Sequence, residues 1–243
     1  MNILPILFAK SELDLEYVIR EATFEGKVII VLLIIFSVVA WSIMAAKAVE
    51  MRKARRLNRY FDQEFRRQKQ VLAIHDRRIA VEGCPLFAVY TAGGHELEQR
   101  LKLAGGEERR TRLSLKSIEH IKRTLERAVA EEALKLESGL ILLAIAVSGA
   151  PFLGLLGTVW GVMSAFSGVA RAAAEGGRPD LASMAPGVAA ALVTTVAGLL
   201  VAIPSMFGYN WLVHNLRILT VELDNFAQEL MSRVETEFLV DDE

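Results

Sequence analysis

Three threonines, Thr158, Thr194 and Thr195, stand in long segments that contain no Asp, Glu, Lys, Arg or His. A hydroxyl both donates and accepts hydrogen bonds, so it can order water or pass a proton along a chain of such bonds. In a helix it also often donates to a carbonyl one turn earlier, and the sequence leaves both roles open. A hydroxyl does not hold a proton at ordinary pH, whereas intramembrane acids and histidines do. If a complex containing this chain moves protons, another polypeptide must supply the titrating group.

The rest of the chain offers little further chemistry. Its single cysteine, Cys84, excludes an intrachain disulfide and a cysteine-based zinc site within one chain. The histidines lack metal-ligand spacing, and no phosphate-binding loop is present. The net charge of −1 gives no argument for a nucleic-acid partner. We therefore expect no enzyme, no metal site, no cofactor and no bound nucleic acid. The histidines are His75, His95, His120 and His214.

Three uncharged apolar runs must position the threonines. They cover residues 28–46, 139–170 and 181–213. A hydrocarbon core of about 30 Å needs roughly 20 helical residues, and only helices or closed barrels satisfy the backbone there. Central helices of a large soluble protein are the alternative, but too few residues remain to cover three of them. The sequence predicts an all-α integral membrane protein with three transmembrane helices.

Basic residues near the span ends predict the orientation. Nine Lys or Arg lie between Lys47 and Lys69, and four more lie between Lys122 and Lys135. The positive-inside rule then places the N-terminus outside and the large polar region in the cytoplasm. The predicted segments beside the spans are an extracytoplasmic 1–27, a cytoplasmic helical domain 47–138, an extracytoplasmic turn 171–180 and a cytoplasmic helix or tail 214–243.

Small side chains recur every three or four residues along the second and third spans. In lipid, such faces permit close backbone approach and mark helix–helix contacts. The two spans can pack on each other within one subunit, which the pattern favours, or against other copies and partners. The small residues are Ala150, Gly154, Gly157, Gly161, Ser164 and Gly168, then Gly187, Ala190, Ala191, Thr194, Gly198, Ala202 and Ser205. Pro151, Pro186 and Pro204 can kink these helices or end them.

The polar region reads as helical hairpins. Breaks are expected at Cys84–Pro85 and Gly105–Gly106. From residue 107 an apolar stripe continues into the second span, which predicts one long helix entering the membrane. The basic run Arg52–Arg59 is either a solvated face beside the membrane or a site for anionic membrane lipid.

Two segments resemble a known family. They read GLLGTVWGVMSAF (Gly154 to Phe166) and APGVAAALVTTVAGLLVAIPSMFGYN (Ala185 to Asn210). In order and separation they resemble the paired signature of the MotA/TolQ/ExbB proton-channel family. The first span and the basic region are similar to that family in layout more than in residues. Having three spans fits the TolQ and ExbB branches, and the tail around Asp224–Phe226 is similar to that of TolQ.

The resemblance implies an inner-membrane subunit that assembles as a pentamer around a pore. The pore would hold the single-span helices of a TolR- or ExbD-like dimer, whose aspartate takes up protons, and a TolA- or TonB-like protein would receive the work. Thr158 and Thr195 match the family's pore threonines. TolQ and ExbB commonly carry a glutamate where this chain has Ala190, which strengthens dependence on the partner's acid.

Two other functions compete with a proton-driven energy transducer. The chain could be a scaffold that assembles through its small-residue faces and conducts nothing. It could also be a membrane-anchored binding module in which residues 47–138 suffice to bind a partner. Valine substitutions at Thr158 and Thr195 separate the first two functions, because only a proton path needs the hydroxyls.

Overall fold

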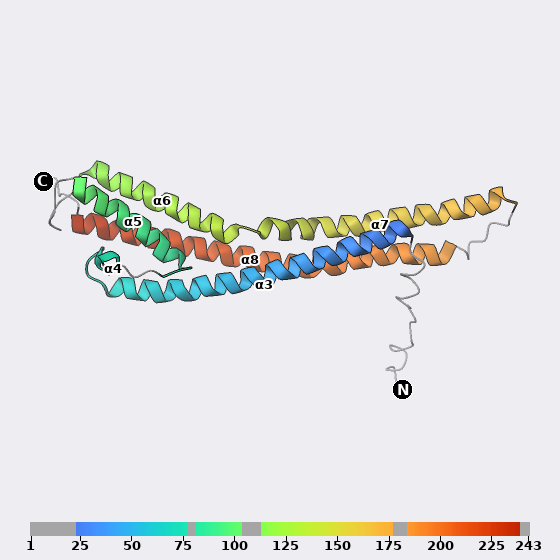
Figure 1. The fold of residues 1–243 in the computed structure, drawn as a ribbon, viewed down its shortest axis with the longest axis horizontal. Helices are drawn as coiled ribbons and strands as arrows, with labels where there is room; N and C mark the ends of the chain where they lie inside the picture. Colours follow the sequence, from blue (N-terminus) through green and yellow to red (C-terminus); the bar gives the residue numbers. More distant parts are fainter. Residues whose placement is uncertain (1–22, 77–80, 104–112, 177–183, 239–243) are drawn as a thin grey trace, which may run out of the picture. The chain divides into compact units, whose positions relative to one another are not determined.

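The computed structural model describes residues 23–76, 81–103, 113–176 and 184–238, and these are almost entirely helical (Figure 1). The predicted break at Gly105–Gly106 lies outside the described residues. The helices are α3 (Phe24–Arg67), α4 (Ala73–Asp76), α5 (Pro85–Leu103), α6 (Leu115–Glu137), α7 (Leu140–Ala174) and α8 (Ala185–Phe238). The all-α prediction is confirmed.

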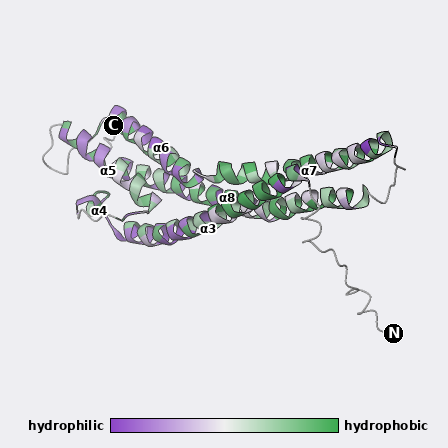
Figure 2. Cartoon of the chain, turned by 45° about the vertical axis from the view of Figure 1, so that its right-hand side comes forward, coloured by the Kyte–Doolittle hydropathy of each residue, from purple (hydrophilic) through white to green (hydrophobic). Residues whose placement is uncertain are grey.

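Three of these helices are long and apolar enough to cross a membrane. They are α3, α7 and α8, with 44, 35 and 54 residues. In Figure 2 the hydrophobic colour gathers on stretches of these three helices, and α4 and α6 are largely hydrophilic. The prediction of three membrane helices is confirmed. Both α3 and α8 continue without a break well beyond their uncharged runs.

The chain divides into two compact units. We call residues 1–44 and 140–209 the membrane unit, and residues 45–139 and 210–243 the polar unit. The membrane unit brings α3, α7 and α8 together: Ile29 and Leu33 of α3 form one buried cluster with Ala150 of α7 and Ala202 of α8. At a second contact between α3 and α7, the ring edge of Phe36 lies beside Gly149. The first span therefore supports the pair that carries the threonines.

The prediction of one unbroken helix from the polar region into the second span is wrong. Helix α6 ends at Glu137, and α7 begins at Leu140. Between them Gly139 has φ +84°, in the left-handed region that residues with a Cβ rarely adopt. The Lys47 ammonium donates to the carbonyl of Leu136 at 3.3 Å and to the hydroxyl of Ser138 at 3.4 Å. Lys47 thus satisfies a carbonyl that the helix end leaves without an intrahelical partner.

Aromatic side chains form the core of the polar unit. Phe61, Phe65, Phe87, Tyr90 and Phe226 contact one another with ring centroids 5.1–6.5 Å apart. The Tyr90 ring is fully buried, and burial raises the pKa of its phenol. Helix α5 starts at Pro85, and the sequence predicted a break in the chain at Cys84–Pro85. Large buried side chains of this kind are typical of a unit stabilised by the hydrophobic effect in water.

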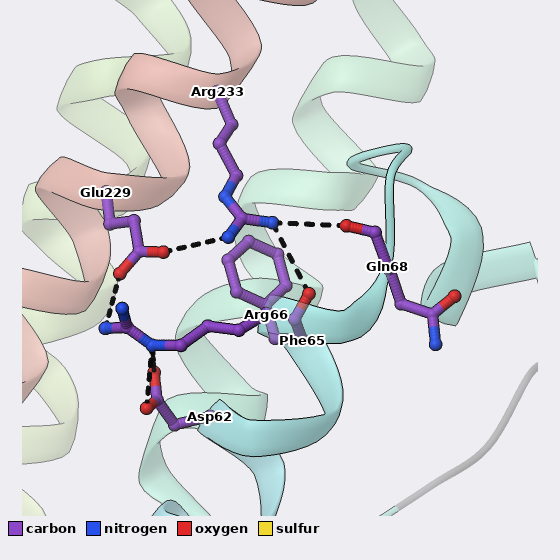
Figure 3. Close-up of polar contacts among 6 residues, drawn as sticks. All are labelled: Asp62, Phe65, Arg66, Gln68, Glu229 and Arg233. Atoms are coloured by element: carbon purple, nitrogen blue, oxygen red, sulfur yellow. Dashed lines mark hydrogen bonds and ion pairs between the residues drawn. The ribbon is translucent and has the colours of Figure 1, made fainter.

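An ion-pair network joins the C-terminal end of α3 to α8 in the polar unit (Figure 3). The Arg233 guanidinium lies over the Phe65 ring at 4.4 Å and donates to the carbonyls of Phe65 and Gln68. It also pairs with Glu229 at 3.0 Å, and Glu229 pairs with Arg66 at 2.7 Å. Arg233 therefore satisfies carbonyls at the C-terminus of α3, although it lies far along the sequence in α8.

Candidate functional site

The second and third spans meet through their small residues. A Cβ added to Gly154 would lie 2.8 Å from the carbonyl oxygen of Thr194, and one added to Gly198 would lie 2.6 Å from that of Ala150. A Cβ on Gly161 would lie 2.6 Å from the Cβ of Ala191. These separations are too short for any side chain. Helices α7 and α8 thus approach backbone to backbone within one chain, which is the arrangement that the spacing favoured.

Two of the threonines share one backbone carbonyl, and the third contacts one of these two. The Thr194 hydroxyl is 3.0 Å from the carbonyl oxygen of Gly154, and the Thr195 hydroxyl is 3.1 Å from the same oxygen. The Thr195 hydroxyl is also 3.4 Å from that of Thr158. Each hydroxyl has one hydrogen to donate, so Thr195 donates either to the carbonyl or to Thr158. The site is a short set of exchangeable hydrogen bonds between α7 and α8.

The two neighbouring threonines of α8 occupy different environments. Thr194 is 1% exposed and fits against Gly157, and the nearer of the two carbonyl acceptors of its hydroxyl is that of Ala191, at 2.6 Å. Thr195 and Thr158 are only partly buried, and Thr158 donates to the carbonyl of Leu155 at 2.7 Å. Thr194 is therefore part of the helix contact. The Thr158–Thr195 hydroxyl pair is the part of the site that another molecule can reach.

The remaining predicted residues fall at several places in the membrane unit. Gly187 lies beside Ala165, since its added Cβ would be 3.3 Å from that of Ala165. Ser164 is partly buried. Ala190 is buried, with Val193 packed beside it, so this position holds no polar group.

The prolines also differ in position. Pro151 and Pro204 lie inside α7 and α8. Each lacks the N–H that would donate to the carbonyl four residues earlier, which permits a bend. Pro186 is the second residue of α8, where a missing N–H removes no helical bond. Pro186 begins its helix instead of interrupting it.

The described parts of the three uncharged runs, 28–46, 139–170 and 184–213, contain no Asp, Glu, Lys, Arg or His. Among all described residues, no group of three or more His, Cys, Asp or Glu could hold a metal ion. The site can accept, donate and relay hydrogen bonds. It cannot store a proton, because a hydroxyl does not titrate at ordinary pH.

Large apolar side chains surround this hydroxyl pair on the outside of the membrane unit. Leu155 and Val159 flank Thr158 along α7 and are exposed, as are Leu192 and Leu199 near Thr195. An exposed apolar surface of this kind requires lipid or other apolar helices around it.

Sequence reasoning missed the shared acceptor. The carbonyl oxygen of Gly154 is within hydrogen-bond distance of the hydroxyls of Thr194 and Thr195, but a backbone atom leaves no signal in residue types. The pattern did hold a clue to the different roles of the threonines. Thr194 belongs to the small-residue face with Ala191 and Gly198, whereas Thr195 lies one residue outside it.

The fold and the site define a multi-pass membrane protein whose second and third uncharged runs, in α7 and α8, meet through glycines and hydroxyls. The chain belongs to the MotA/TolQ/ExbB proton channel family, whose model matches residues 95–225. The match runs from α5 to α8 and includes every threonine and glycine of the site. The resemblance found in the two motifs is confirmed, and the chain is a multi-pass inner-membrane protein of this family.

Curated relatives extend the similarity over most of the chain. The Tol-Pal system protein TolQ of Haemophilus influenzae is 30% identical over 225 residues, which cover 90% of this chain and 92% of TolQ. The biopolymer transport protein ExbB of Salmonella typhimurium is 29% identical over 91% of this chain and 86% of its own length. ExbB of Neisseria meningitidis is 27% identical over 85% of this chain and 90% of its own length. The chain is a TolQ/ExbB-like member of the family.

Proposed function

We propose that this chain is the proton-channel subunit of an inner-membrane complex that couples the proton gradient to work on the cell envelope. Membership of a proton channel family supports this function, as do relatives named ExbB and TolQ. The observation that carries it is the Thr158–Thr195 hydroxyl pair, which is partly exposed within two apolar runs, 139–170 and 184–213, that contain no acid.

In this proposal the hydroxyl pair works beside a proton-holding acid on another chain. Thr195 can turn its hydrogen from the Gly154 carbonyl to the Thr158 hydroxyl, because both acceptors lie within 3.4 Å. A carboxylate or water at the open side can then accept or donate a hydrogen bond without breaking the α7–α8 contact. One charge that crosses about 100 mV releases roughly 2.3 kcal/mol, so useful work needs several protons.

The partners follow from the same proposal. The acid belongs to a TolR- or ExbD-like single-span protein, and a TolA- or TonB-like protein receives the work. The chain assembles as a homo-oligomer, a pentamer by resemblance to the family, with its N-terminus outside and residues 47–138 in the cytoplasm. Relatives named TolQ and ExbB both match over most of the chain, and the tail around Asp224 favours the TolQ-like branch.

The test is the double variant Thr158→Val, Thr195→Val, which keeps the side-chain shape and removes both hydroxyls. Ser148→Ala, Ser167→Ala is the matched control, because both serines of α7 are exposed and donate only to their own helix. Proton flux is measured in liposomes that contain the chain and its single-span partner. We expect the flux to fall at least tenfold in the threonine variant, with the size of the complex unchanged.

The alternatives predict other outcomes of the same experiment. A non-conducting scaffold gives equal results for the threonine variant and the serine control, and equal results would refute the proton path. A membrane-anchored binding module would keep its cellular function when the two hydroxyls are removed. A complementation assay with the same two variants separates it from the transducer.

A further inference from the structure

Three arginines form a stripe along α3 in the polar unit. Arg52, Arg56 and Arg59 follow one another at intervals of four and three residues, so they lie on one face of the helix. The exposed ring of Tyr60 lies at the far end of this arginine stripe. A hollow of about 550 Å³ follows it. Its lining includes Arg52, Arg55, Arg56, Arg59, Tyr60 and Gln63.

The arginine stripe has no acidic partner among the described residues. Other arginines of the polar unit pair with a carboxylate on their own helix, for example Arg100 with Glu96 at 2.7 Å and Arg123 with Glu119 at 3.1 Å. Within residues 23–76, 81–103, 113–176 and 184–238, no ion pair or hydrogen bond is found for Arg52, Arg56 or Arg59. Three guanidinium groups therefore face the hollow with their donors available.

The acids near the arginine stripe are already engaged. Glu50 pairs with Lys47 at 2.8 Å, and Asp62 pairs with Arg66 at 3.0 Å. Glu222 of α8 lies 4.0 Å from Arg55, whose buried Nε has no hydrogen-bond partner in the described part of the chain. Lys53 adds a further positive charge on the same segment. The hollow is consequently a positive site: Glu222 lies beside Arg55, and within the described part of the chain no acid pairs with the other three arginines of the lining.

The arginine stripe begins close to the membrane. Arg52 follows Ala46, the last residue of the uncharged run, by six residues of unbroken helix, which is about 9 Å along the axis. Side chains of a helix lean toward its N-terminus, so those of Arg52 and Arg56 reach back toward the span. Trp211 of the polar unit lies 5.9 Å from the Arg52 guanidinium and is exposed. Tryptophan is enriched where a membrane meets water.

We propose that the arginine stripe binds the phosphate headgroup of an anionic membrane lipid. Guanidinium groups bind phosphate oxygens in pairs of hydrogen bonds, and a phosphodiester between acyl chains and a polar head lies at this depth. A free phosphate ester has the same charge, but the nearby span and Trp211 favour a lipid. The inference rests on the arginines, the first span and Trp211, so it stands independently of the proposed proton path.

The experiment measures lipid binding to the purified full-length complex in detergent by native mass spectrometry. Phosphatidylglycerol is titrated against phosphatidylcholine, which carries the same phosphate but no net charge. The variant is Arg52→Gln, Arg56→Gln, Arg59→Gln. The control is Arg67→Gln, Arg123→Gln, Arg127→Gln, which removes the same charge from exposed arginines that have acidic partners.

We expect the wild type and the control to bind phosphatidylglycerol at least tenfold more tightly than phosphatidylcholine. Each basic residue near an anionic surface contributes roughly fivefold to binding, so the stripe variant should lose about 100-fold. If the variant fails to fold, the salt dependence of the wild type replaces it: the preference should shrink between low and high salt.

Four results would overturn the proposal. The wild type could show no preference for the anionic lipid, or the stripe variant could keep the preference of the control. Glycerol 3-phosphate could also displace the lipid at millimolar concentration, which would make the hollow a site for a soluble phosphate ester. A stripe variant with normal lipid binding but a smaller complex would assign the stripe to contact between copies and equally refute lipid binding.

Discussion

The two units of this protein are built from some of the same helices but pack by different rules. In the membrane unit the contacts are made by glycine, alanine and threonine, and large side chains such as Phe152 and Phe207 lie exposed. In the polar unit large rings such as Phe65 and Tyr90 are buried. Helices α3 and α8 contribute to both units, so each changes its packing along its length.

The surrounding medium explains this contrast. In lipid, burying an apolar side chain gains little, and helices associate through close approach and interhelical hydrogen bonds. In water, burial of large apolar surfaces is the dominant stabilising force. The membrane unit should therefore be most sensitive to added volume, and the polar unit to lost volume. The following experiments test that difference, from the largest expected effect to the smallest.

Added volume at the α7–α8 contact should have the largest effect. In Gly154→Leu the new Cβ would lie 2.8 Å from the backbone oxygen of Thr194 and 2.9 Å from the Cα of Thr195. The backbone cannot move aside cheaply, so we expect loss of the assembled complex in size-exclusion chromatography. Gly168→Leu on the same helix is the control, because nothing lies within 4 Å of its added Cβ. If both variants elute at the size of the assembled complex, the close α7–α8 contact is not needed for assembly and this prediction is wrong.

Lost volume should affect the polar unit next most strongly. Phe65→Ala removes a fully buried ring and should destabilise the unit by about 3–5 kcal/mol. The single thiol, Cys84, is 3% exposed, and burial raises its pKa, so it should react with a maleimide only when the unit opens. Labelling should become faster by a factor of more than 100 in this variant. Tyr60→Ala, at a ring 76% exposed, should leave the rate within a few-fold of wild type.

A smaller effect is expected at the buried phenol. Tyr90 donates to the carbonyl of Val71 at 2.7 Å and accepts from the N–H of His75 at 2.9 Å. Tyr90→Phe leaves the Val71 carbonyl and the His75 N–H without this hydrogen-bond partner. The substitution should lower the free energy of unfolding of the polar unit by about 1–3 kcal/mol.

The same phenol predicts a pH dependence. Burial raises the pKa of Tyr90 in the folded unit, so the unfolded chain loses this proton first as pH rises. The neutral phenol therefore contributes to the stability of the folded unit. This contribution is complete below the unfolded pKa of about 10 and is lost as pH rises through the higher pKa of the folded state. Thiol labelling that stays equally pH-dependent in Tyr90→Phe would contradict this origin.

The smallest effect should come from exposed ion pairs. Arg123 and Glu119 are both largely exposed on α6 and pair at 3.1 Å. Arg123→Gln should change the stability of the polar unit by about 0.5 kcal/mol or less. Arg233→Gln should lower the stability of the polar unit by more than this, because it removes a guanidinium that lies over the Phe65 ring and donates to the carbonyl of Phe65 at the end of α3. Chemical denaturation of the two variants side by side checks this order.

Much of the fold could be predicted because charge is segregated along the chain. Uncharged runs identify membrane helices with few alternatives, and Cys84–Pro85 marks a helix start. The break between α6 and α7 was missed because apolar residues such as Leu136 and Leu140 keep helical spacing across it. What favours the break is Lys47, which is 89 residues from Leu136 in sequence and beside it in space.

The candidate site was predictable in its residue types but not in its geometry. The motifs pointed to Thr158, Thr194 and Thr195, and all three lie at the α7–α8 contact. Adjacent residues of a helix point about 100° apart, so Thr194 and Thr195 differ in burial although both reach the Gly154 carbonyl. Their separate surroundings depend on where α7 lies, which residue types alone do not encode.

The most direct test of the account is proton flux through the purified chain alone. Helices that supply hydroxyls but no titrating group should not conduct by themselves. In liposomes with an imposed pH gradient and membrane potential, we predict that the chain alone gives the same flux as protein-free liposomes. Flux should appear when the proposed TolR- or ExbD-like partner is added and vanish when the membrane aspartate that the proposal assigns to it is replaced by asparagine. Conduction by the chain alone would contradict the central claim.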